Sequence, residues 1–245
     1  MIARFIYGDR VFNGNVEGDR ISSNGVSYEL RAVRLLPPSV PTKVVCVGLN
    51  YLEHARELRM EIPEEPIIFL KPPSAVVGHD DEIILPEMSK RVDYEGELAV
   101  VISKRCRGIS ADEADDYILG YTCFNDVTAR DLQQKDGQWT RSKSFDTFAP
   151  FGPWVAQMSV EDAEDLNIST RVNGETRQRS KTSDLIFGIA ELLEFVSSIM
   201  TLEPGDVIAT GTPPGVGRLE SGDIVEVEIE GIGVLRNRAV SSTPA

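Results

Sequence analysis

The chain has 245 residues, of which 41% are hydrophobic and 26% are charged, and its formal net charge is −14. These values are typical of a globular protein with one large domain, or with one domain and a small appendage. The negative charge repels the phosphates of nucleic acid and of anionic membranes, so we expect neither as a partner. Acidic residues are in excess and lysine is scarce, which is consistent with either a salt-loving host or a GC-rich genome.

Two further features concern the cellular location. No apolar run reaches the length of a membrane span, and the N-terminus lacks the pattern of a signal peptide, so we expect a cytoplasmic protein. Cys46, Cys106 and Cys123 are widely spaced and have the spacing of neither a metal site nor a disulfide framework. Cys46 lies in an apolar run, which predicts a buried thiol.

The first forty residues have the pattern of a small β unit. Three short strands are predicted at residues 2–7, 11–16 and 20–21. Turn signals lie between or beside them at Gly8-Asp9, Asn13-Gly14, Gly18-Asp19 and Asn24-Gly25. Prolines at positions 37, 38 and 41 then predict a linker. We therefore expect an N-terminal β appendage over residues 1–41 and a main domain over residues 42–245.

The main domain alternates between strand and helix signals without a regular order. Apolar and β-branched runs predict strands at residues 43–47, 67–70, 92–102, 121–124, 207–209 and 224–229, with a hairpin turn at 173–174. Helices are expected at 51–60, 110–119 and 184–200. Asn50 can cap the first helix, with Glu53 as its reciprocal partner, and Ser110 and Glu113 form a capping box at the start of the second. Strands outnumber helices, which predicts a β-rich α+β fold.

Two acidic residues lie two positions apart in the predicted strand 92–102. Side chains alternate along a strand, so Glu95 and Glu97 point to the same side, and Gly96 frees the opposite face for a close approach. Neighbouring carboxylates repel each other and require open water or a cation, and Mg²⁺ takes oxygen ligands. The spacing alone leaves a metal site and a solvated edge strand both open. Asp126, at the end of the strand 121–124, meets the pair if the two strands are neighbours.

Two side chains are candidates for proton transfer. His54 precedes Glu57 by three positions in the predicted helix, which places both on one face. A carboxylate beside an imidazole fixes its tautomer, as a general base requires, although a surface ion pair has the same spacing. Lys143 lies among aromatic residues, where desolvation can tune its pKa, but an ordinary surface lysine is the alternative. His79 lies among turn residues and is expected to be structural or solvated.

A glycine-rich turn follows the strand 207–209. It is similar to an anion cradle but lacks the lysine and the spacing of a P-loop, so a nucleotide site is not expected.

Taken together, six segments resemble the fumarylacetoacetate hydrolase family in its short bacterial and archaeal form, over residues 42–240. In chain order they are Gly48–Glu57, Phe69–Ser74, Asp93–Leu98, Asn125–Asp131, Lys143–Asp146 and Thr210–Pro213.

The resemblance implies a mixed β-roll, like the C-terminal domain of that family, with a deep metal-centred pocket and a homodimer. It assigns Glu95, Glu97 and Asp126 as ligands of Mg²⁺ or Mn²⁺. It assigns His54 and Glu57 as a catalytic pair on a segment that often closes as a lid.

The resemblance also implies roles for five further positions. Lys143 matches a catalytic lysine at the outer shell of the metal. The positions that it implies for contact with the substrate are Arg130, Gln133, Gly211 and Thr212.

We therefore expect an enzyme that acts on a small-molecule 2-oxo acid. The first expectation is hydrolysis of a C–C bond in a 2,4-dioxo acid, such as an acylpyruvate or fumarylacetoacetate, through a metal-stabilised enolate. Oxaloacetate decarboxylation and isomerisation of 2-hydroxyhepta-2,4-diene-1,7-dioate can use the same site and stay open. The alternative is that the protein is not an enzyme but a metal-dependent binding module. The residues around 56–60 and 134–139 are expected to line the distal end of the substrate.

Overall fold

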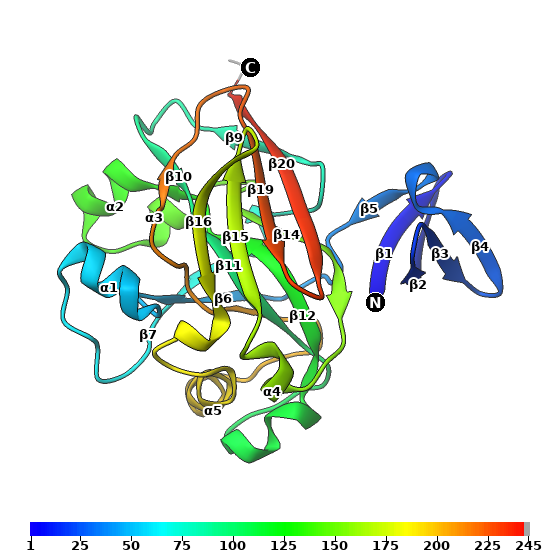
Figure 1. Cartoon of the computed structure of the whole chain (residues 1–245), viewed down its shortest axis with the longest axis horizontal. Coiled ribbons are helices and arrows are strands. Elements are labelled where there is room, and N and C mark those ends of the chain that lie inside the picture. Colours follow the sequence, from blue (N-terminus) through cyan, green and yellow to red (C-terminus); the bar gives the residue numbers. More distant parts are fainter. Residues whose placement is uncertain (243–245) are drawn as a thin grey trace.

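The computed structural model describes residues 1–242, which form three sheets and five short α-helices (Figure 1). The fold is a β-rich α+β fold, as the sequence predicts. The helices are α1 Leu52–Leu58, α2 Arg130–Asp136, α3 Thr140–Lys143, α4 Val160–Ala163 and α5 Ile189–Ile199. Turns of 3₁₀ helix lie at Leu30–Ala32, Pro73–Ala75, Ala111–Asp116 and Thr182–Asp184. Among the described residues, no helix is long and apolar enough to cross a membrane.

The largest sheet has twelve strands and runs from the N-terminal unit into the main body. Its main path is β4-β3-β2-β1-β14-β12-β11-β17-β6-β7, while β5 pairs with β1 and β8 pairs with β14. The N-terminal strands are β1 Ile2–Tyr7, β2 Arg10–Glu17, β3 Arg20–Ser23, β4 Val26–Glu29 and β5 Arg34–Leu36. The others are β6 Val44–Gly48, β7 Ile67–Lys71, β8 Val76–Val77, β11 Gly96–Ile102, β12 Ile118–Asn125, β14 Ala149–Ala156 and β17 Val207–Ala209.

A second sheet packs face to face against the large one. It has the order β16-β15-β19-β20-β9. Its strands are β9 Glu82–Leu85, β15 Asn167–Val172, β16 Glu175–Lys181, β19 Ile224–Ile229 and β20 Gly233–Ser241. Three short strands form the third sheet, and they are β10 Val92–Tyr94, β13 Thr128–Ala129 and β18 Gly217–Arg218.

The main core lies between the two large sheets and under α5. Leu98 and Val100 of β11 pack there with Val227 of β19 and Leu192 of α5. β11 has strand neighbours on both sides and all seven of its residues are buried, so its two faces look into two different cores. This central strand carries Glu97, which is why that carboxylate lies in the interior of the protein.

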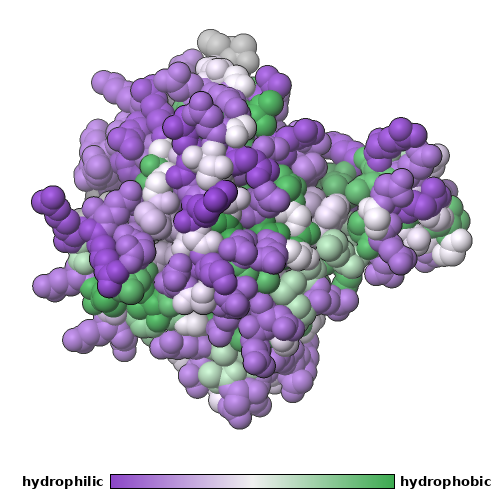
Figure 2. Space-filling model, in the orientation of Figure 1, coloured by the Kyte–Doolittle hydropathy of each residue, from purple (hydrophilic) through white to green (hydrophobic). Residues whose placement is uncertain are grey.

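The N-terminal strands form a lobe beside the main body (Figure 1), with a small core of their own around Phe5 and Ile21. One register pair, Ile2 with Val155, joins β1 to β14. The division into an appendage and a main domain stays a prediction. Figure 2 shows a mostly hydrophilic surface on the main body, whereas hydrophobic and hydrophilic residues are mixed on the N-terminal lobe.

Several sequence predictions are confirmed by the observed elements. The strand pattern at residues 224–229 has Val225, Val227 and Ile229 buried, and the hairpin turn at 173–174 joins β15 to β16. The capping box of Ser110 and Glu113 is present. Cys46 is buried, with a pKa raised well above its usual value by burial and by nearby Asp126.

Other predicted boundaries were wrong. The run 92–102 is two strands, β10 and β11, because the chain leaves one sheet and enters another at Glu95. Asn13-Gly14 lies inside β2, where a Cβ on Gly14 would come 2.6 Å from a backbone oxygen of Ser22. Residues 111–116 form a 3₁₀ helix and β12 already begins at Ile118. The helix α5 begins only at Ile189, after a 3₁₀ turn.

The predicted cap of α1 was also wrong. The N-cap residue is Tyr51, and the Asn50 side chain forms tertiary hydrogen bonds instead. Its amide nitrogen donates to the carbonyl oxygens of Phe187 and Thr210, at 3.1 and 2.8 Å, and its oxygen accepts from the Phe187 N–H. Asn50 thereby joins the start of α1 to the turn after β17 and to the segment before α5.

Asp206 anchors the segment that leads from the N-terminal lobe into the main body. It is fully buried, and its Oδ1 accepts hydrogen bonds from the backbone N–H and the hydroxyl of Thr42, both at 2.8 Å. Its Oδ2 accepts from the Glu203 N–H at 2.9 Å and pairs with Lys43. Burial alone would raise the pKa of Asp206, but these hydrogen bonds hold it below the usual value.

We expect Asp206→Asn to lower the free energy of unfolding at neutral pH by about 2 kcal/mol, because buried donors lose a charged acceptor. A carboxylate with a lowered folded-state pKa contributes stability above its unfolded pKa of about 3.9. That contribution disappears as the pH falls through the folded-state value. Urea unfolding at several pH values tests this expectation, and a difference between wild type and variant that is equally large in acid would contradict it.

Candidate active site and metal centre

Three carboxylates converge where β10, β11 and β12 meet. Glu95 lies between β10 and β11, Glu97 lies in β11, and Asp126 directly follows β12. The antiparallel register pairs Gly96 with Asn125, and the Asp126 N–H donates to the Glu95 carbonyl at 2.8 Å. One oxygen from each carboxylate lies within 4.8 Å of the others, and all three residues are buried. The pairing of β11 with β12 therefore builds the triad.

Gly96 allows the other sheet to approach the triad closely. A Cβ at this position would lie 2.0 Å from the hydroxyl oxygen of Thr170 in β15. The Gly96 N–H donates to Gln178 Oε1 at 3.0 Å. The sequence predicted that Gly96 leaves room for other backbone to approach, and the groups that approach it in the structure are side chains.

Buried cations surround the triad. Lys143 Nζ lies 3.0 Å from Glu95 Oε2 and 2.5 Å from Asp126 Oδ2, with only 2% of its side chain exposed. Arg130 pairs with Glu95, and the Thr128 hydroxyl donates to the same carboxylate at 3.0 Å. Lys143 is therefore a buried ion-pair partner of two carboxylates and not a surface lysine.

The two glutamates have opposite pKa shifts. Burial alone would raise the pKa of Glu95, but Lys143 and Arg130 hold it well below its usual value. Burial raises the pKa of Glu97, and the charges of Asp126 and Glu95 raise it further. Among the described residues, Glu97 pairs with no cation, and the Gly211 N–H at 2.8 Å is the one hydrogen bond to its carboxylate. Glu97 therefore requires a proton or a further cation.

The donor set fits a hard divalent cation. All three groups offer carboxylate oxygens, which suit Mg²⁺ and Mn²⁺ rather than softer metals. Asp126 Oδ1 is buried and faces Lys71 Nζ at 2.6 Å as an ion pair, so among the described residues Glu97 is the carboxylate of the triad without a cation. A divalent ion would compensate Glu97. Glu95, Glu97 and Asp126 are thus the residues that could hold the metal.

The predicted proton-transfer pair forms in α1. His54 Nδ1 lies 3.0 Å from Glu57 Oε2, and His54 is 8% exposed whereas the Glu57 side chain is half-exposed. The same Glu57 oxygen accepts from the Gly215 N–H at 3.4 Å. A neutral imidazole that donates from Nδ1 keeps Nε2 as a base. His54 is buried, so the pair is not an ion pair on an open surface.

One cavity of about 290 Å³ connects the triad with His54. Its apolar wall includes Phe69 and Trp139, whose ring centroids are 5.2 Å apart, and Lys143 Nζ lies 4.9 Å from the centre of the Phe69 ring. The site residues that line it are His54, Glu95, Glu97, Asp126, Arg130, Gln133, Lys143 and Thr212. Met60 and Gln134 also line the cavity, within the segments expected around the distal end of the substrate.

Arg130 and Gln133 lie in α2 and hold each other at the cavity. Arg130 Nη1 donates to Gln133 Oε1 at 2.7 Å, and Arg130 Nε donates to Asp93 Oδ2 at 2.9 Å. The Gln133 amide nitrogen keeps its donors for another partner. Asp93 is fully buried and also pairs with Arg91 at 2.9 Å. Sequence reasoning missed Asp93 as an anchor of Arg130, although it lies in the Asp93–Leu98 segment.

Gly211 and Thr212 are bound within the protein. The Gly211 N–H donates to Glu97, as described above, and the Thr212 hydroxyl donates to the Gly96 carbonyl at 2.9 Å. That hydroxyl also accepts from Gln178 Nε2 at 2.8 Å. Both residues therefore bind β11, the strand that carries Glu97. Gln178, which sequence reasoning missed, joins this turn to Gly96, and its position in a polar strand offered no signal.

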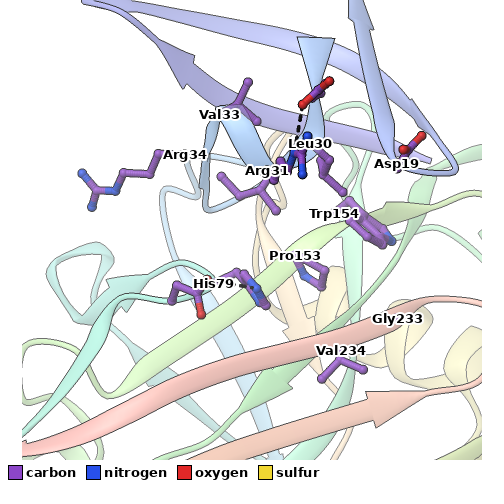
Figure 3. Close-up of a pocket in the computed structure, with 13 residues that line it drawn as sticks. Asp19, Leu30, Arg31, Val33, Arg34, His79, Pro153, Trp154, Gly233 and Val234 are labelled. Carbon is purple, nitrogen blue, oxygen red and sulfur yellow. Dashed lines mark hydrogen bonds and ion pairs between the residues drawn. The ribbon is translucent and has the colours of Figure 1, made fainter.

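A larger cavity of about 950 Å³ lies elsewhere, between the N-terminal lobe and the main body (Figure 3). Arg31 and Arg34 approach it from the lobe, and His79 and Trp154 approach it from the body. His79 Nδ1 accepts from the Arg236 N–H at 3.1 Å, which confirms a structural role. This cavity contains none of the predicted site residues, so size alone does not identify the candidate site.

A β-rich α+β fold whose buried acidic triad could hold a metal in a small cavity is typical of enzymes that act on small molecules. The family model for fumarylacetoacetate (FAA) hydrolase, C-terminal, matches residues 43–240. The chain belongs to the fumarylacetoacetate hydrolase family, as the six segments of the sequence predicted.

Three relatives illustrate the range of reactions in the family. The chain is 50% identical over 216 residues to the mitochondrial oxaloacetate tautomerase FAHD2A of Bos taurus, covering 84% of this chain and 69% of that one. It is 46% identical to the structure of 5-carboxymethyl-2-hydroxymuconate delta-isomerase from Mycobacterium smegmatis, with a TM-score of 0.93 and 99% coverage of both chains. It is 30% identical to maleylpyruvate hydrolase from Sphingobium sp. SYK-6 in complex with manganese(II) ion and pyruvate, with a TM-score of 0.85 and 99% coverage of both.

Gly96→Ala should destabilise the fold by about 1–3 kcal/mol, because its Cβ would collide with the Thr170 hydroxyl. That hydroxyl is buried and has no hydrogen-bond partner in the described structure, so its removal in Thr170→Ala should relieve the collision. A double-mutant cycle measured by denaturant unfolding tests the pair. Additive effects of the two substitutions would contradict this expectation.

Glu97→Gln should weaken Mn²⁺ binding at least about tenfold, because an amide removes one anionic ligand. Isothermal titration calorimetry with Mn²⁺ measures the effect. Glu194→Gln is a matched control, since it makes the same change at an exposed site on α5. Equal affinities in the two variants would refute the assignment of Glu97 as a ligand.

Proposed function

We propose that this chain catalyses keto–enol tautomerisation of a 2-oxo dicarboxylic acid of the oxaloacetate type, with a divalent cation bound by the triad. The observation that carries this proposal is that one cavity is lined by His54, which Glu57 contacts through Nδ1, by a buried lysine and by three carboxylates. The identity of 50% to an oxaloacetate tautomerase supports the choice of reaction.

The charges at the site favour an acidic substrate. Four buried carboxylates face three buried or largely buried cations, and these are Asp93, Glu95, Glu97 and Asp126 with Lys71, Arg130 and Lys143. A bound divalent cation therefore gives the group a positive charge, which a carboxylate substrate neutralises. This balance of charges supports an acidic substrate over a neutral molecule.

The residues divide the proton transfer between them. His54, oriented through Nδ1 by Glu57, offers Nε2 to remove a proton from the carbon next to the 2-oxo group. Lys143 Nζ, on a side chain that is only 2% exposed, can donate a hydrogen bond to the oxygen on which negative charge develops. When bound, the divalent cation supplies Lewis-acid polarisation of the 2-oxo group. In enolisation the proton that His54 removes from carbon is delivered to the enolate oxygen, and in ketonisation His54 takes the proton of the enol hydroxyl and delivers it to that carbon, so no proton is gained or lost overall.

Hydrolysis of a 2,4-dioxo acid, which the resemblance put first, is the second candidate. The same His54 Nε2 can activate a water molecule, and a relative of 30% identity is a maleylpyruvate hydrolase. The higher identity to a tautomerase and to an isomerase reverses the order of the two candidates. The homodimer and the cytoplasmic location stay predictions.

We expect His54→Ala to lower kcat for oxaloacetate tautomerisation by about 10²- to 10⁴-fold, because the general base is lost. Glu57→Gln should give a smaller loss, because the imidazole remains. Mn²⁺ binding, measured by calorimetry, should stay at the wild-type value in both variants, since neither residue is a ligand. A His54→Ala enzyme with normal turnover would refute the role of the pair.

A panel of acids separates the remaining reactions. Loss of the enol absorbance without pyruvate release indicates tautomerisation, pyruvate release from oxaloacetate indicates decarboxylation, and pyruvate release from acetylpyruvate indicates hydrolysis. Mn²⁺ binding without turnover of any 2-oxo acid would favour a metal-dependent binding module and refute the proposed function.

A further inference from the structure

Lys71 is a fully buried charged residue. It is the last residue of the edge strand β7, and it is 0% exposed. The four residues that precede it in the strand, 67–70, are all apolar. It does not line the 290 Å³ cavity. Burial of a lysine is costly unless an anion and hydrogen-bond acceptors compensate it.

Three oxygens surround the Lys71 ammonium group. Nζ lies 2.6 Å from Asp126 Oδ1 as an ion pair. It donates hydrogen bonds to the Val127 carbonyl at 2.9 Å and to the Phe148 carbonyl at 2.6 Å. An ammonium group has three donors, so these partners account for all of them.

The three partners connect separate parts of the chain around one ligand residue. Val127 directly follows Asp126, and the Phe148 carbonyl directly precedes β14. Lys71 therefore joins β7 to the backbone just after Asp126 and to the start of β14. The same ammonium group thus holds the side chain of Asp126 and the carbonyl of the next residue, Val127.

Lys143 contacts the same aspartate from the cavity. Its Nζ lies 2.5 Å from Asp126 Oδ2 and also contacts Glu95, and it lines the cavity that Lys71 does not line. Lys143 can therefore meet a substrate, whereas Lys71 is enclosed by protein. The two lysines carry the same charge at almost the same distance from Asp126 but differ in their other partners.

We propose that Lys71 is a positioning residue of the metal centre, which holds Asp126 in the orientation that binds the divalent cation. This inference rests on the proposed function, in that it requires the triad to bind a cation. Lys71 orients Asp126 through its two hydrogen bonds to carbonyl groups together with its ion pair, and not through its charge alone. Outer residues that orient metal ligands affect metal affinity by about 10- to 100-fold.

Lys71→Met and Lys143→Met form a matched pair, because each removes one positive charge beside Asp126, at 2.6 and 2.5 Å. Loss of charge alone strengthens the attraction of the triad for a cation. We therefore expect Lys143→Met to bind Mn²⁺ at least as tightly as wild type. Lys71→Met should bind Mn²⁺ about tenfold more weakly or worse, because Asp126 loses its support. Calorimetric titration of the purified full chain with Mn²⁺ measures both.

Lys71→Arg keeps the charge and supplies a second comparison if Lys71→Met does not fold. The planar guanidinium cannot reproduce the contacts of the ammonium in an enclosed site, so Mn²⁺ binding should again weaken. Wild-type affinity in Lys71→Arg, or equal shifts in Lys71→Met and Lys143→Met, would overturn the proposal. Failure of both Lys71 variants to fold would assign Lys71 to general stability and would overturn it too.

Wild-type titration separates this inference from the proposed function. A wild-type chain that binds no Mn²⁺ overturns the proposed function and the inference together. Wild-type binding that is insensitive to Lys71 overturns the inference alone.

Discussion

The concentration of like charge in the protein interior is the constraint on which the rest of this structure depends. Three carboxylates that approach within 4.8 Å in a buried site repel each other strongly, because little water screens them. The fold compensates two of them with Lys71, Lys143 and Arg130 and leaves Glu97 without a cation among the described residues. That imbalance makes the triad a suitable site for a divalent ion.

The backbone around the triad is shaped by the same requirement. The chain changes sheets at Glu95, and the register of β11 with β12 brings Asp126 to the break. Gly96 lets the second sheet approach, and Gln178 from that sheet binds both Gly96 and the turn at Thr212. The two large sheets thus meet through hydrogen bonds at this point, whereas apolar packing joins them elsewhere.

The functional groups differ in how they are held. His54 and Glu57 lie on a seven-residue helix whose start is joined to the body through Asn50. The carboxylates lie on or beside central strands with buried neighbours on both sides. The three candidate metal ligands are therefore held by central strands, whereas the candidate base is held by a short helix and the hydrogen bonds of Asn50.

The sequence by itself determined the local geometry: the shared side of Glu95 and Glu97, the reach of His54 to Glu57, the alternation in β19, and the order of six family segments. These features follow from strand and helix periodicity, which act over a few residues. Only the tertiary structure decided that the run 92–102 breaks at Glu95, that Lys71 supports Asp126, and that Gln178 binds Gly96, 82 positions away. Such contacts join segments that are distant along the chain, and their partners are set by sheet order and register, which no local pattern encodes.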